Sequence, residues 1–521
     1  MKKNITIKNV LISVFDKTGI IEFSKALTQK KINLFTTSGT KKILQDVGIK
    51  STDISEYTKI PEIISGRVKT LHHKIYSGVL ARLPHDQDLL NYYKIIKMDL
   101  IIVNFYPFLK TLKNKNSNYQ DIIESIDIGG PTIVRAAIKN YHHIAVITQI
   151  KDYNNVIKEI NFKNKISYKT RLKLAYSAFQ YILEYDCNIA NYFSCLQNAI
   201  KHSKHNYFPK YLNITLKKKQ NLAYGENIHQ KAGLYVNSFK NHNFVQIQGK
   251  TLSYNNVSDF NVAVSCVQEF KKPACVIVKH NNPCGVAISK NCYHAYLSAY
   301  KSDPISAFGG IIAFNRRLNE KIAETIINQQ FAELIIAPKI TKSSLKILSK
   351  KNNIRILKYF NQNINNNVLN IKSFNNHFLV QTNSYNDIKE KKWKIVSKKI
   401  PNIQEMKDAL FALKVVKYLK SNAIVYVKNL KVISIGAGQT SRIDAVKIAT
   451  IKANHNKIDL TQSVVASDAF FPFKDSINVI SKQGVSCIIQ PGGSIRDQEI
   501  ISEVNNYNIS MIFTQIRYFK H

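Results

Sequence analysis

The chain has 521 residues, 45% of them hydrophobic, and a formal net charge of +41 at pH 7. Its length predicts at least two domains, and its hydrophobic content excludes a globally disordered chain. The lysines are spread along the whole sequence and form no basic stripe with interleaved aromatics, so we expect no nucleic-acid partner. In this interpretation compositional drift explains most of the charge, and anionic substrates explain a smaller part.

The cysteines and the N-terminus predict a cytoplasmic protein with no membrane partner. Seven cysteines without a CxxC pair argue against a disulfide framework and against a zinc ribbon. The first apolar segment, Val10–Phe15, is far too short for a signal peptide or a membrane span, and no later segment is long enough either.

The first predicted strand-and-helix units end in turns suited to phosphate. A strand at Val10–Phe15 turns at Asp16–Gly19 into an amphipathic helix whose apolar face is Ile20, Phe23 and Leu27. A second strand at Asn33–Thr36 runs into Thr37–Thr40. A strand, a small-residue turn and a helix N-terminus together aim backbone N–H groups at a phosphate. A plain N-cap at Ser38 or Thr40 is the common alternative.

Three further segments continue the pattern. Gly66–His72 packs two cations and a hydroxyl into four residues on a probable loop, and a strand at Leu100–Phe105 ends in polar and aromatic residues. Ile126–Thr132 opens a helix that ends near Lys139, before a strand at Ile144–Ile147. This alternation predicts an open, mostly parallel α/β sheet whose ligand residues follow its strands.

Five ordered motifs in this region resemble the inosine monophosphate (IMP) cyclohydrolase domain of the bifunctional purine biosynthesis family. They are Phe15-Asp16-Lys17-Thr18-Gly19, Ser38-Gly39-Thr40, Gly66-Arg67-Val68-Lys69-Thr70-Leu71-His72, Asn104-Phe105-Tyr106-Pro107-Phe108 and Ile126-Asp127-Ile128-Gly129-Gly130. The resemblance implies a methylglyoxal-synthase-like parallel-sheet domain. Such a domain closes the ring of formylated aminoimidazole carboxamide ribotide (FAICAR) with loss of water.

The same resemblance implies the residues of this first site. It gives Lys139 the proton-transfer role and places Tyr106 and Asp127 in the catalytic set, although a cation at a helix C-terminus is the plain alternative for Lys139. The residues implied to hold IMP or FAICAR are Phe15, Asp16, Lys17, Thr37, Ser38, Gly39, Thr40, Arg67, Val68, Lys69, Thr70, Asn104, Asp127 and Ile128.

The composition shifts between Ala199 and Gln220, where Lys, His, Asn and Pro209 crowd without clear periodicity. We therefore predict a first domain over 1–199, a linker over 200–220 and a second domain over 221–521.

The second domain contains a Lys-His pair after a buried strand. The apolar run Ala274–Val278 leads into Lys279-His280-Asn281-Asn282-Pro283-Cys284-Gly285, which we expect to leave the core for a site. A protonated Lys279 disfavours a second positive charge nearby, so His280 should stay neutral and able to act as a base. The same ammonium can stabilise an oxyanion. For the dipeptide alone, a solvated strand end is the plain alternative.

This domain resembles the family's aminoimidazole carboxamide ribotide (AICAR) transformylase domain in many ordered motifs. They are Tyr224-Gly225-Glu226-Asn227, Leu252-Ser253-Tyr254-Asn255-Asn256, Lys279-His280-Asn281, Asp303-Pro304, Ser306-Ala307-Phe308-Gly309-Gly310, Glu333-Leu334-Ile335-Ile336-Ala337-Pro338, Lys420-Ser421-Asn422-Ala423, Gly436-Ala437-Gly438-Gln439-Thr440-Ser441-Arg442, Ser467-Asp468-Ala469-Phe470-Phe471-Pro472-Phe473, Gln490-Pro491-Gly492-Gly493-Ser494 and Phe513-Thr514 with Arg517. The implied fold is a duplicated cytidine-deaminase-like α/β unit. A zinc deaminase is a rival, but its H-x-E…P-C-x-x-C ligand pattern is absent, so we expect no metal.

The resemblance implies formyl transfer from 10-formyltetrahydrofolate, the co-substrate, to the amine of AICAR. His280 would be the base, Lys279 would stabilise the oxyanion and the departing folate nitrogen, and Asn422 would orient the carboxamide. The implied AICAR contacts are Tyr224, His280, Gly309, Glu333, Asn422 and Arg442. The implied folate contacts are Ile443, Phe470, Asp475, Gly492, Gly493 and Arg517, with core packing as the plain alternative for Ile443 and Phe470.

Three departures from the family pattern bear on the second activity. Ala223 stands where the family usually has Arg, and Gln515 and Tyr518 stand where Gly and His are usual. We expect a weakened affinity for AICAR, for which the ammonium groups of Lys217–Lys219 can compensate. The resemblance implies a homodimer with transformylase sites at the interface. The alternatives are a degenerate enzyme that retains only the cyclohydrolase step and, from a different class, a basic nucleic-acid-binding protein.

Overall fold

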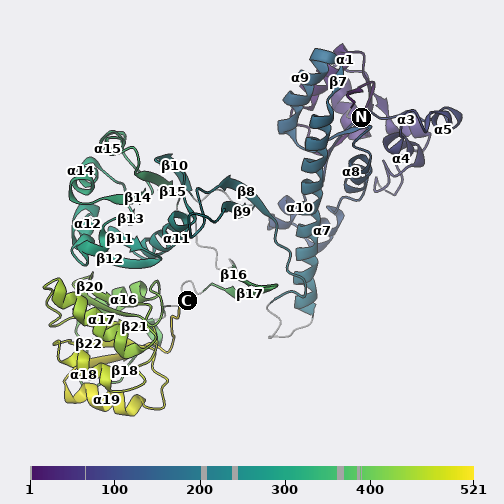
Figure 1. Cartoon of the computed structure of the whole chain (residues 1–521). Coiled ribbons are helices and arrows are strands. Elements are labelled where there is room, and N and C mark those ends of the chain that lie inside the picture. The colour runs from purple at the N-terminus through teal and green to yellow at the C-terminus, as the bar shows by residue number, and fades with distance from the viewer. Residues whose placement is uncertain are drawn as a thin grey trace. The chain divides into compact units, whose positions relative to one another are not determined.

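The computed structural model describes residues 3–64, 66–200, 208–237, 244–360, 369–383, 388 and 390–521. The chain divides into two compact units, Met1–Thr215 and Leu216–His521 (Figure 1). The division at 215/216 falls inside the range 200–220.

The first unit is built on a five-stranded parallel sheet. Its strand order is β4-β3-β2-β5-β6, and every neighbouring pair runs parallel. The strands are β2 (Asn9–Val14), β3 (Asn33–Thr36), β4 (Thr52–Asp53), β5 (Leu100–Asn104) and β6 (Ala145–Ile147). Alternate residues of β2 and β5 enter separate apolar clusters, as expected for central strands covered on both faces. The predicted parallel α/β sheet is confirmed.

Helices follow the strands of this sheet. They are α1 (Ile20–Gln29), α2 (Ser38–Gln45), α3 (Ile54–Thr58), α4 (His73–Leu80), α5 (Gln87–Tyr92), α6 (Phe108–Lys113), α7 (Tyr119–Glu124), α8 (Gly129–Lys139), α9 (Tyr153–Lys163) and α10 (Tyr168–Ile200). Helix α1 buries Ile20, Phe23 and Leu27, the face that the sequence predicted. A short antiparallel pair, β1 (Ile5–Thr6) with β7 (Lys165–Ile166), lies outside the main sheet.

The second unit contains a twelve-stranded sheet made of two similar halves. The first half is β11 (Ala274–Lys279), β12 (Asn282–Ile288), β13 (Gly310–Phe314), β14 (Ala332–Ala337) and β15 (Arg355–Tyr359). The second is β19 (Ile424–Lys428), β20 (Lys431–Gly436), β21 (Val464–Ser467), β22 (Cys487–Gln490) and β23 (Ser510–Phe513). The order β15-β14-β13-β11-β12-β20-β19-β21-β22-β23 is the same in both directions from the β12–β20 junction.

Strand directions repeat as well. In each half the first strand is antiparallel to both of its neighbours, and the last two pairs are parallel. The predicted duplication is therefore confirmed by strand order and direction. β10 (Phe244–Gln248) and β18 (Lys394–Ile395) extend the two ends of the sheet. Two hairpins stand apart, β8 (Leu216–Asn221) with β9 (Gly233–Asn237) and β16 (Leu369–Phe374) with β17 (His377–Thr382).

The helices of the second unit also occur in matching places. The first half has α11 (Tyr254–Gln268), α12 (Cys292–Tyr300), α13 (Pro304–Ala307), α14 (Glu320–Gln329) and α15 (Lys342–Leu348). The second has α16 (Ile403–Val416), α17 (Arg442–His455), α18 (Asp475–Ser481) and α19 (Asp497–Asn506). A Cβ on Gly285 or Gly436 would lie 2.1 Å from the Ala299 oxygen or 1.9 Å from the Ala445 oxygen, so glycine lets α12 and α17 lie directly on their strands.

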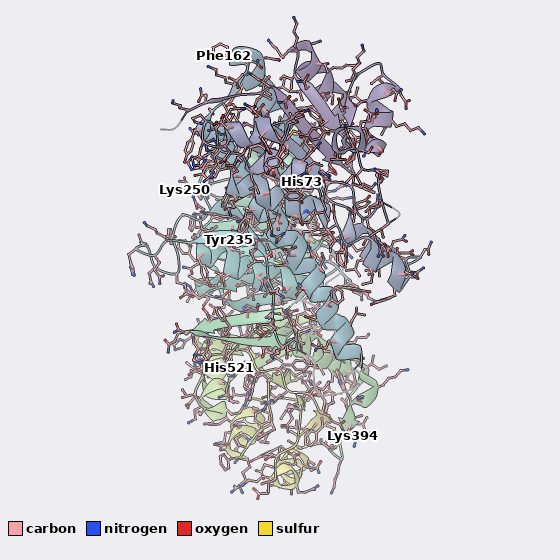
Figure 2. All side chains as sticks on the ribbon, turned by 90° about the vertical axis from the view of Figure 1, so that its right-hand side faces the viewer. His73, Phe162, Tyr235, Lys250, Lys394 and His521 are labelled. Carbon is pink, nitrogen blue, oxygen red and sulfur yellow. The ribbon has the colours of Figure 1, made fainter. Side chains whose placement is uncertain are left out.

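Nitrogen-tipped side chains extend from the ribbon along the whole chain in Figure 2, in agreement with the dispersed lysines of the sequence. Among the helices that the structure describes, none is both long and apolar enough to cross a membrane.

Candidate active sites

A cleft of about 570 Å³ opens at the carboxyl ends of β2, β3 and β5 in the first unit. Parallel sheets bind ligands at this edge because loops of neighbouring strands meet there. The predicted site residues that line the cleft are Phe15, Lys17, Thr37, Gly39, Arg67, Lys69, Thr70, Asn104, Tyr106, Asp127 and Ile128.

Two helix N-termini face this cleft. Helix α2 begins after Thr37 and helix α8 after Ile128, and neither N-cap side chain hydrogen-bonds to the first turn. Gly39, Gly129 and Gly130 line the cleft itself. The first turn of α2 therefore has no cap from its N-cap side chain, which is the arrangement that binds a phosphate, whereas in α8 the Gly130 N–H already donates to Asp127 Oδ1 at 2.8 Å. The alternative of a plain cap at Ser38 or Thr40 does not occur.

The Asn104 side chain joins two strand ends. Its Oδ1 accepts hydrogen bonds from the backbone N–H groups of Phe15, at 2.6 Å, and Asp16, at 2.9 Å. Its Nδ2 donates to the Asp16 carbonyl at 2.9 Å. One amide from β5 thus fixes the loop after β2.

Three cations border the cleft, and two of them pair with carboxylates. Arg67 pairs with Glu124, with 3.2 Å from Nε to Oε2, and Lys69 Nζ lies 3.2 Å from Glu62 Oε2. Lys17 donates to the Val14 carbonyl. Burial, and then the nearby Lys69 ammonium, lower the pKa of Lys17. A phosphate dianion would relieve this repulsion between ammonium groups.

Asp127 and Tyr106 are titratable residues that line this cleft. Asp127 Oδ1 accepts the Gly130 N–H at 2.8 Å, and its own N–H donates to the Tyr185 hydroxyl at 2.7 Å. Burial raises the pKa of Asp127 despite the hydrogen bonds that it accepts. The Tyr106 ring lies 5.1 Å from the Phe15 ring, centroid to centroid.

Some predicted residues of this site do not line the cleft: Asp16, Ser38, Thr40, Val68 and Lys139. Lys139 is exposed at the last position of α8, an 11-residue helix whose ends lie about 15 Å apart, while Gly129 at the other end lines the cleft. Its proton-transfer role stays a prediction. Sequence reasoning missed the cleft residue Glu124, because a lone glutamate at the end of α7 belongs to none of the motifs.

In the second unit, Lys279 and His280 lie at a tight hairpin turn. Lys279 pairs with Asn282, so His280 and Asn281 form a two-residue turn between β11 and β12. Both have positive φ, 53° and 61°, as this type of turn requires. The chain does not end its strand pairing at this turn: it reverses into β12, which keeps Pro283 to Gly285 in the sheet.

A cleft of about 360 Å³ adjoins this turn. Its lining includes Lys279, His280, Asn282, Asp303 and Gln439. The Lys279 ammonium donates to the Phe308 carbonyl at 2.7 Å, beside Gly309, whose φ of 72° favours glycine. The Lys420 N–H donates to Asn282 Oδ1 at 2.9 Å and so joins the loop before Asn422 to the hairpin.

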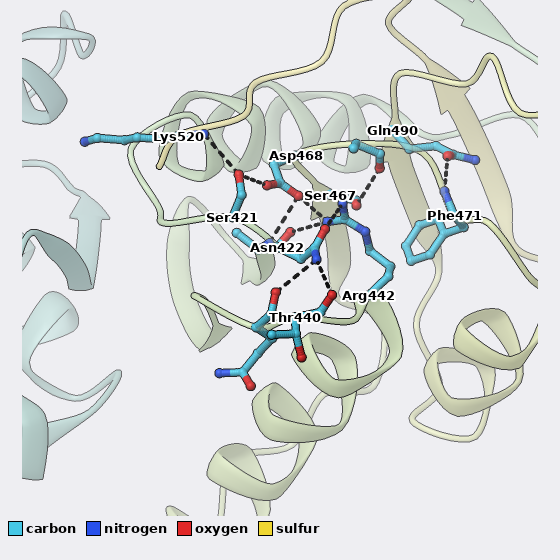
Figure 3. A network of polar contacts seen from close by, with 12 residues as sticks. Ser421, Asn422, Thr440, Arg442, Ser467, Asp468, Phe471, Gln490 and Lys520 are labelled. Atoms are coloured by element: carbon cyan, nitrogen blue, oxygen red, sulfur yellow. Dashed lines mark hydrogen bonds and ion pairs between the residues drawn. The ribbon is translucent and has the colours of Figure 1, made fainter. Parts of the chain in front are cut away.

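A buried polar network holds Asn422 and Arg442 (Figure 3). Arg442 Nη2 donates to Asn422 Oδ1 at 2.7 Å, and its Nη1 pairs with Asp468, whose side chain is 0% exposed. Asp468 Oδ2 accepts from the Ser421 hydroxyl at 2.6 Å, and that hydroxyl accepts the Lys520 N–H at 3.0 Å. Both Nη atoms of Arg442 are therefore held by protein groups, and Nη2 fixes the side chain of Asn422.

The predicted AICAR and folate residues do not share one cavity in the described part of a single chain. Arg517 lines a separate groove of about 680 Å³ with Lys372, Tyr418 and Lys520. Glu333 lies in an ion pair with Arg355 at 3.2 Å. The predicted residues that line neither of these two clefts are Tyr224, Gly309, Glu333, Asn422, Arg442, Ile443, Phe470, Asp475, Gly492 and Gly493.

The three residues that depart from the family pattern have different surroundings. Ala223 is exposed. The Lys219 ammonium already donates to the Phe244 carbonyl at 3.2 Å and lies 4.3 Å from that ring's centroid. Gln515 has a φ of 62°, in the left-handed region that favours glycine, and Tyr518 is buried. Within the described residues, no group of three His, Cys, Asp or Glu side chains is placed to hold a metal ion.

Comparisons with known proteins identify the family of this chain. Residues 19–132 match the MGS-like domain model, and residues 137–452 match the AICARFT/IMPCHase bienzyme model. The bifunctional purine biosynthesis protein PurH of Buchnera aphidicola subsp. Baizongia pistaciae is 54% identical over 523 residues, which cover 99% of each chain. Those of subspecies Acyrthosiphon pisum and Schizaphis graminum are 49% and 48% identical, with 100% of each chain covered. The crystal structure of ForH matches with 29% identity over 36% of this chain and 98% of that chain, at a TM-score of 0.33.

The family model spans more than half of the chain, and the relatives align from end to end. Together they show that this chain belongs to the AICARFT/IMPCHase bienzyme family.

Proposed function

We propose that the two reactions of this bifunctional enzyme are divided between its units, with ring closure in Met1–Thr215 and formyl transfer in Leu216–His521. The chain is an AICAR formyltransferase and IMP cyclohydrolase of purine biosynthesis. It transfers a formyl group from 10-formyltetrahydrofolate to AICAR and closes FAICAR to IMP. The MGS-like match over residues 19–132 lies wholly in the first unit and supports the division.

In the cyclohydrolase step the carboxamide nitrogen of FAICAR attacks the formyl carbon, loses a proton, and the resulting hydroxyl leaves as water. The observation that carries this assignment is the cleft that holds the uncapped N-terminus of α2, the N-terminus of α8 and three cations beside Asp127 and Tyr106. The helix ends, with Lys17, Arg67 and Lys69, hold the phosphate. Asp127 and Tyr106 lie beside the base and move protons there. Lys139 is the alternative proton-transfer group.

In the transformylase step the amine of AICAR is a weak nucleophile, because its lone pair is delocalised into the imidazole ring. His280 removes a proton from the amine as it attacks the formyl carbon. Lys279 stabilises the oxyanion, and such a donor contributes about 3 kcal/mol. Asn422, held by Arg442, orients the carboxamide. Tyr224, Gly309 and Glu333 complete the proposed AICAR contacts, and the predicted folate residues receive the co-substrate.

We further propose a homodimer with composite transformylase sites, in the cytoplasm. The separation of Arg517 from the His280 cleft supports this assembly, because a second copy can bring the two sets of residues together. All seven cysteines are free thiols, which supports a reducing compartment.

The test is turnover of the full-length protein with AICAR and 10-formyltetrahydrofolate, following tetrahydrofolate and IMP separately. We expect both products. His280→Ala should reduce tetrahydrofolate formation by about 100-fold or more, while supplied FAICAR is still converted to IMP. Asp127→Asn and Lys139→Ala are compared for accumulation of FAICAR, which identifies the proton-transfer group. His294→Ala, a partly exposed histidine on α12, is the matched control and should retain both activities.

Other outcomes separate the alternatives. IMP from supplied FAICAR without any tetrahydrofolate would mean a degenerate second unit, and restoration by Ala223→Arg would trace the loss to that position. Tight, salt-sensitive nucleic-acid binding without turnover of either substrate would favour the nucleic-acid-binding alternative.

A further inference from the structure

The turn that carries His280 has a counterpart in the other half of the second unit. His280 and Asn281 connect β11 to β12 with φ angles of 53° and 61°, and Asn429 and Leu430 connect β19 to β20 with φ angles of 54° and 57°. Residues other than glycine seldom adopt this conformation, although Asn and His adopt it more often than most. Four such residues in two equivalent turns require specific support from the surrounding structure.

The support in each half is one buried aspartate on the preceding helix. Asp259 of α11 accepts the Asn281 N–H at 2.6 Å, and Asp408 of α16 accepts the Leu430 N–H at 2.6 Å and the Asn429 N–H at 2.9 Å. The separation from aspartate to the second turn residue is 22 in both cases. Asp259 is 9% exposed and Asp408 is 4% exposed. Holding the turn is therefore a property of the repeated fold.

The two aspartates differ in what their turns carry. Asn429 and Leu430 have no titratable side chain, whereas His280 lines the cleft with Lys279. Burial raises the pKa of the Asp259 carboxyl, the Asn281 N–H and the His280 charge lower it, and Glu333 of β14 raises it. Asp259 therefore contacts the turn through the Asn281 N–H and also interacts with the charge of His280.

We propose that Asp259 is a positioning residue for formyl transfer: its carboxylate fixes the turn that aims His280 and stabilises the imidazolium formed when His280 takes the amine proton. This inference rests on the proposed role of His280 as the base. The proton moves from the amine of AICAR to the imidazole, and Asp259 stays ionised throughout. A carboxylate next to a base favours the protonated form of that base, so it lowers the energy of the state in which the proton has moved.

The other polar and charged groups around the turn do not stabilise a positive His280 in place of Asp259. The Lys279 ammonium, on the strand that precedes the turn, opposes a positive His280 and donates to the Phe308 carbonyl. The Glu333 carboxylate already pairs with Arg355 at 3.2 Å. The Asn281 side-chain amide lies 2.7 Å from the Ser258 hydroxyl, which anchors the turn a second time without any charge. The turn can therefore persist when the charge of Asp259 is removed.

The experiment compares Asp259→Asn with Asp408→Asn in the full-length protein. Asparagine keeps a side-chain oxygen that can accept the turn N–H, so both variants remove a charge and retain the hydrogen bond. For each, kcat and KM for formyl transfer are measured against pH, and cyclohydrolase turnover of supplied FAICAR and the urea midpoint are measured on the same preparation.

For Asp259→Asn we expect kcat to fall by about 10- to 100-fold, with the KM for AICAR changed less than about threefold. The acid limb of the kcat profile should move to lower pH, because the imidazolium loses its carboxylate neighbour. Asp408→Asn should lower the urea midpoint to a similar extent yet leave kcat and the pH profile unchanged. Cyclohydrolase turnover should be unaffected in both.

Equal effects of the two variants on kcat, or an unmoved acid limb in Asp259→Asn, would overturn the proposal and leave Asp259 a fold residue. If either variant fails to fold, Asn281→Gly replaces it as a probe of the turn. Glycine adopts the left-handed conformation freely, so Asn281→Gly should keep the turn and leave kcat unchanged. Asp259→Glu keeps the charge but moves it, so a reduced kcat would support the proposal that the position of the carboxylate matters. A reduced kcat in Asn281→Gly together with an unchanged kcat in Asp259→Glu would contradict it. Full formyl transfer by His280→Ala would instead refute the proposed base itself.

Discussion

At the scale of single residues, Lys520 places an ammonium in a mostly buried position next to the Asn422 network. Its Nζ donates to the Tyr418 carbonyl at 3.3 Å, and its backbone N–H donates to the Ser421 hydroxyl at 3.0 Å. Burial, more than the repulsion from Lys420, lowers the pKa of Lys520 to about 8 from its ordinary value of 10.5, and Cys266 opposes the shift. The folded chain therefore releases this proton at a lower pH than the unfolded chain does.

This lysine should give the second unit a distinct pH dependence. Below about pH 8 the folded and unfolded chains both carry the charge, so the folded state bears the full cost of burying it. Between about pH 8 and 10.5 the folded chain releases the proton and the unfolded chain keeps it, so stability rises with pH. Lys520→Met lacks this titration, so its free energy of unfolding should not share the rise. The difference between variant and parent in the free energy of unfolding should therefore decrease by about 2 kcal/mol from pH 7 to 9.5.

Urea unfolding at the two pH values measures this difference. Subtracting the free energy of unfolding of the parent from that of the variant cancels the contributions of the other titrating groups, such as the buried tyrosines. Lys394→Met, an exposed lysine of β18, is the control and should show a difference that does not change with pH. A constant difference for Lys520→Met as well would show that the ammonium is solvated in solution.

At the scale of elements, both halves of the second unit depend on helices that lie directly on strands. Gly436 of β20 leaves no room for a side chain, because a Cβ would lie 1.9 Å from the Ala445 oxygen of α17. Gly436→Ala should lower the free energy of unfolding by about 1–3 kcal/mol, since the helix must move away from the strand. Denaturant unfolding monitored by the single tryptophan, Trp393, reports on this unit.

The control is Gly39→Ala in α2, where a new Cβ would meet no atom within 4 Å. Because α2 lies in the first unit and Trp393 in the second, both variants are also followed by far-ultraviolet circular dichroism. Alanine is the better helix former, so this variant should leave stability unchanged or slightly increased. Equal destabilisation by the two substitutions would contradict the close contact between α17 and β20.

At the scale of the whole molecule, the proposed composite site makes formyl transfer depend on protein concentration. Arg517 and His280 line different clefts in one chain, whereas the cyclohydrolase cleft is lined by residues of the first unit alone. On dilution, tetrahydrofolate formation per mole of enzyme should fall together with the dimer, and conversion of supplied FAICAR should fall less.

Sedimentation at each concentration gives the dimer fraction, and the two activities are measured on the same samples. Mixing His280→Ala with Arg517→Ala provides an internal check. If the two residues act across the interface, mixed dimers should regain up to about a quarter of the parent's formyl transfer. Undiminished transfer by a sedimenting monomer would refute the homodimeric site.

Much of the fold follows from local sequence. The β2 strand and the α1 helix were predicted from the apolar run at Val10–Phe15 and the spacing of Ile20, Phe23 and Leu27, since periodicity is set by burial of one face. The cleft residues Thr37, Arg67 and Asn104 were found because they lie in motifs next to strand ends. Glu124 and Asp259 lie in no motif with their partners, so they were found only when the chain was folded.

The sequence by itself determined the family, the parallel sheet and the residue types at both sites, because motifs and periodicity are properties of neighbouring residues. Only the tertiary structure decided that His280 sits in a left-handed hairpin turn, that Asp259 supports it from 22 residues away, and that Lys139 lies at the far end of α8. These features depend on contacts between residues far apart in the chain and on backbone conformation, which local composition does not encode.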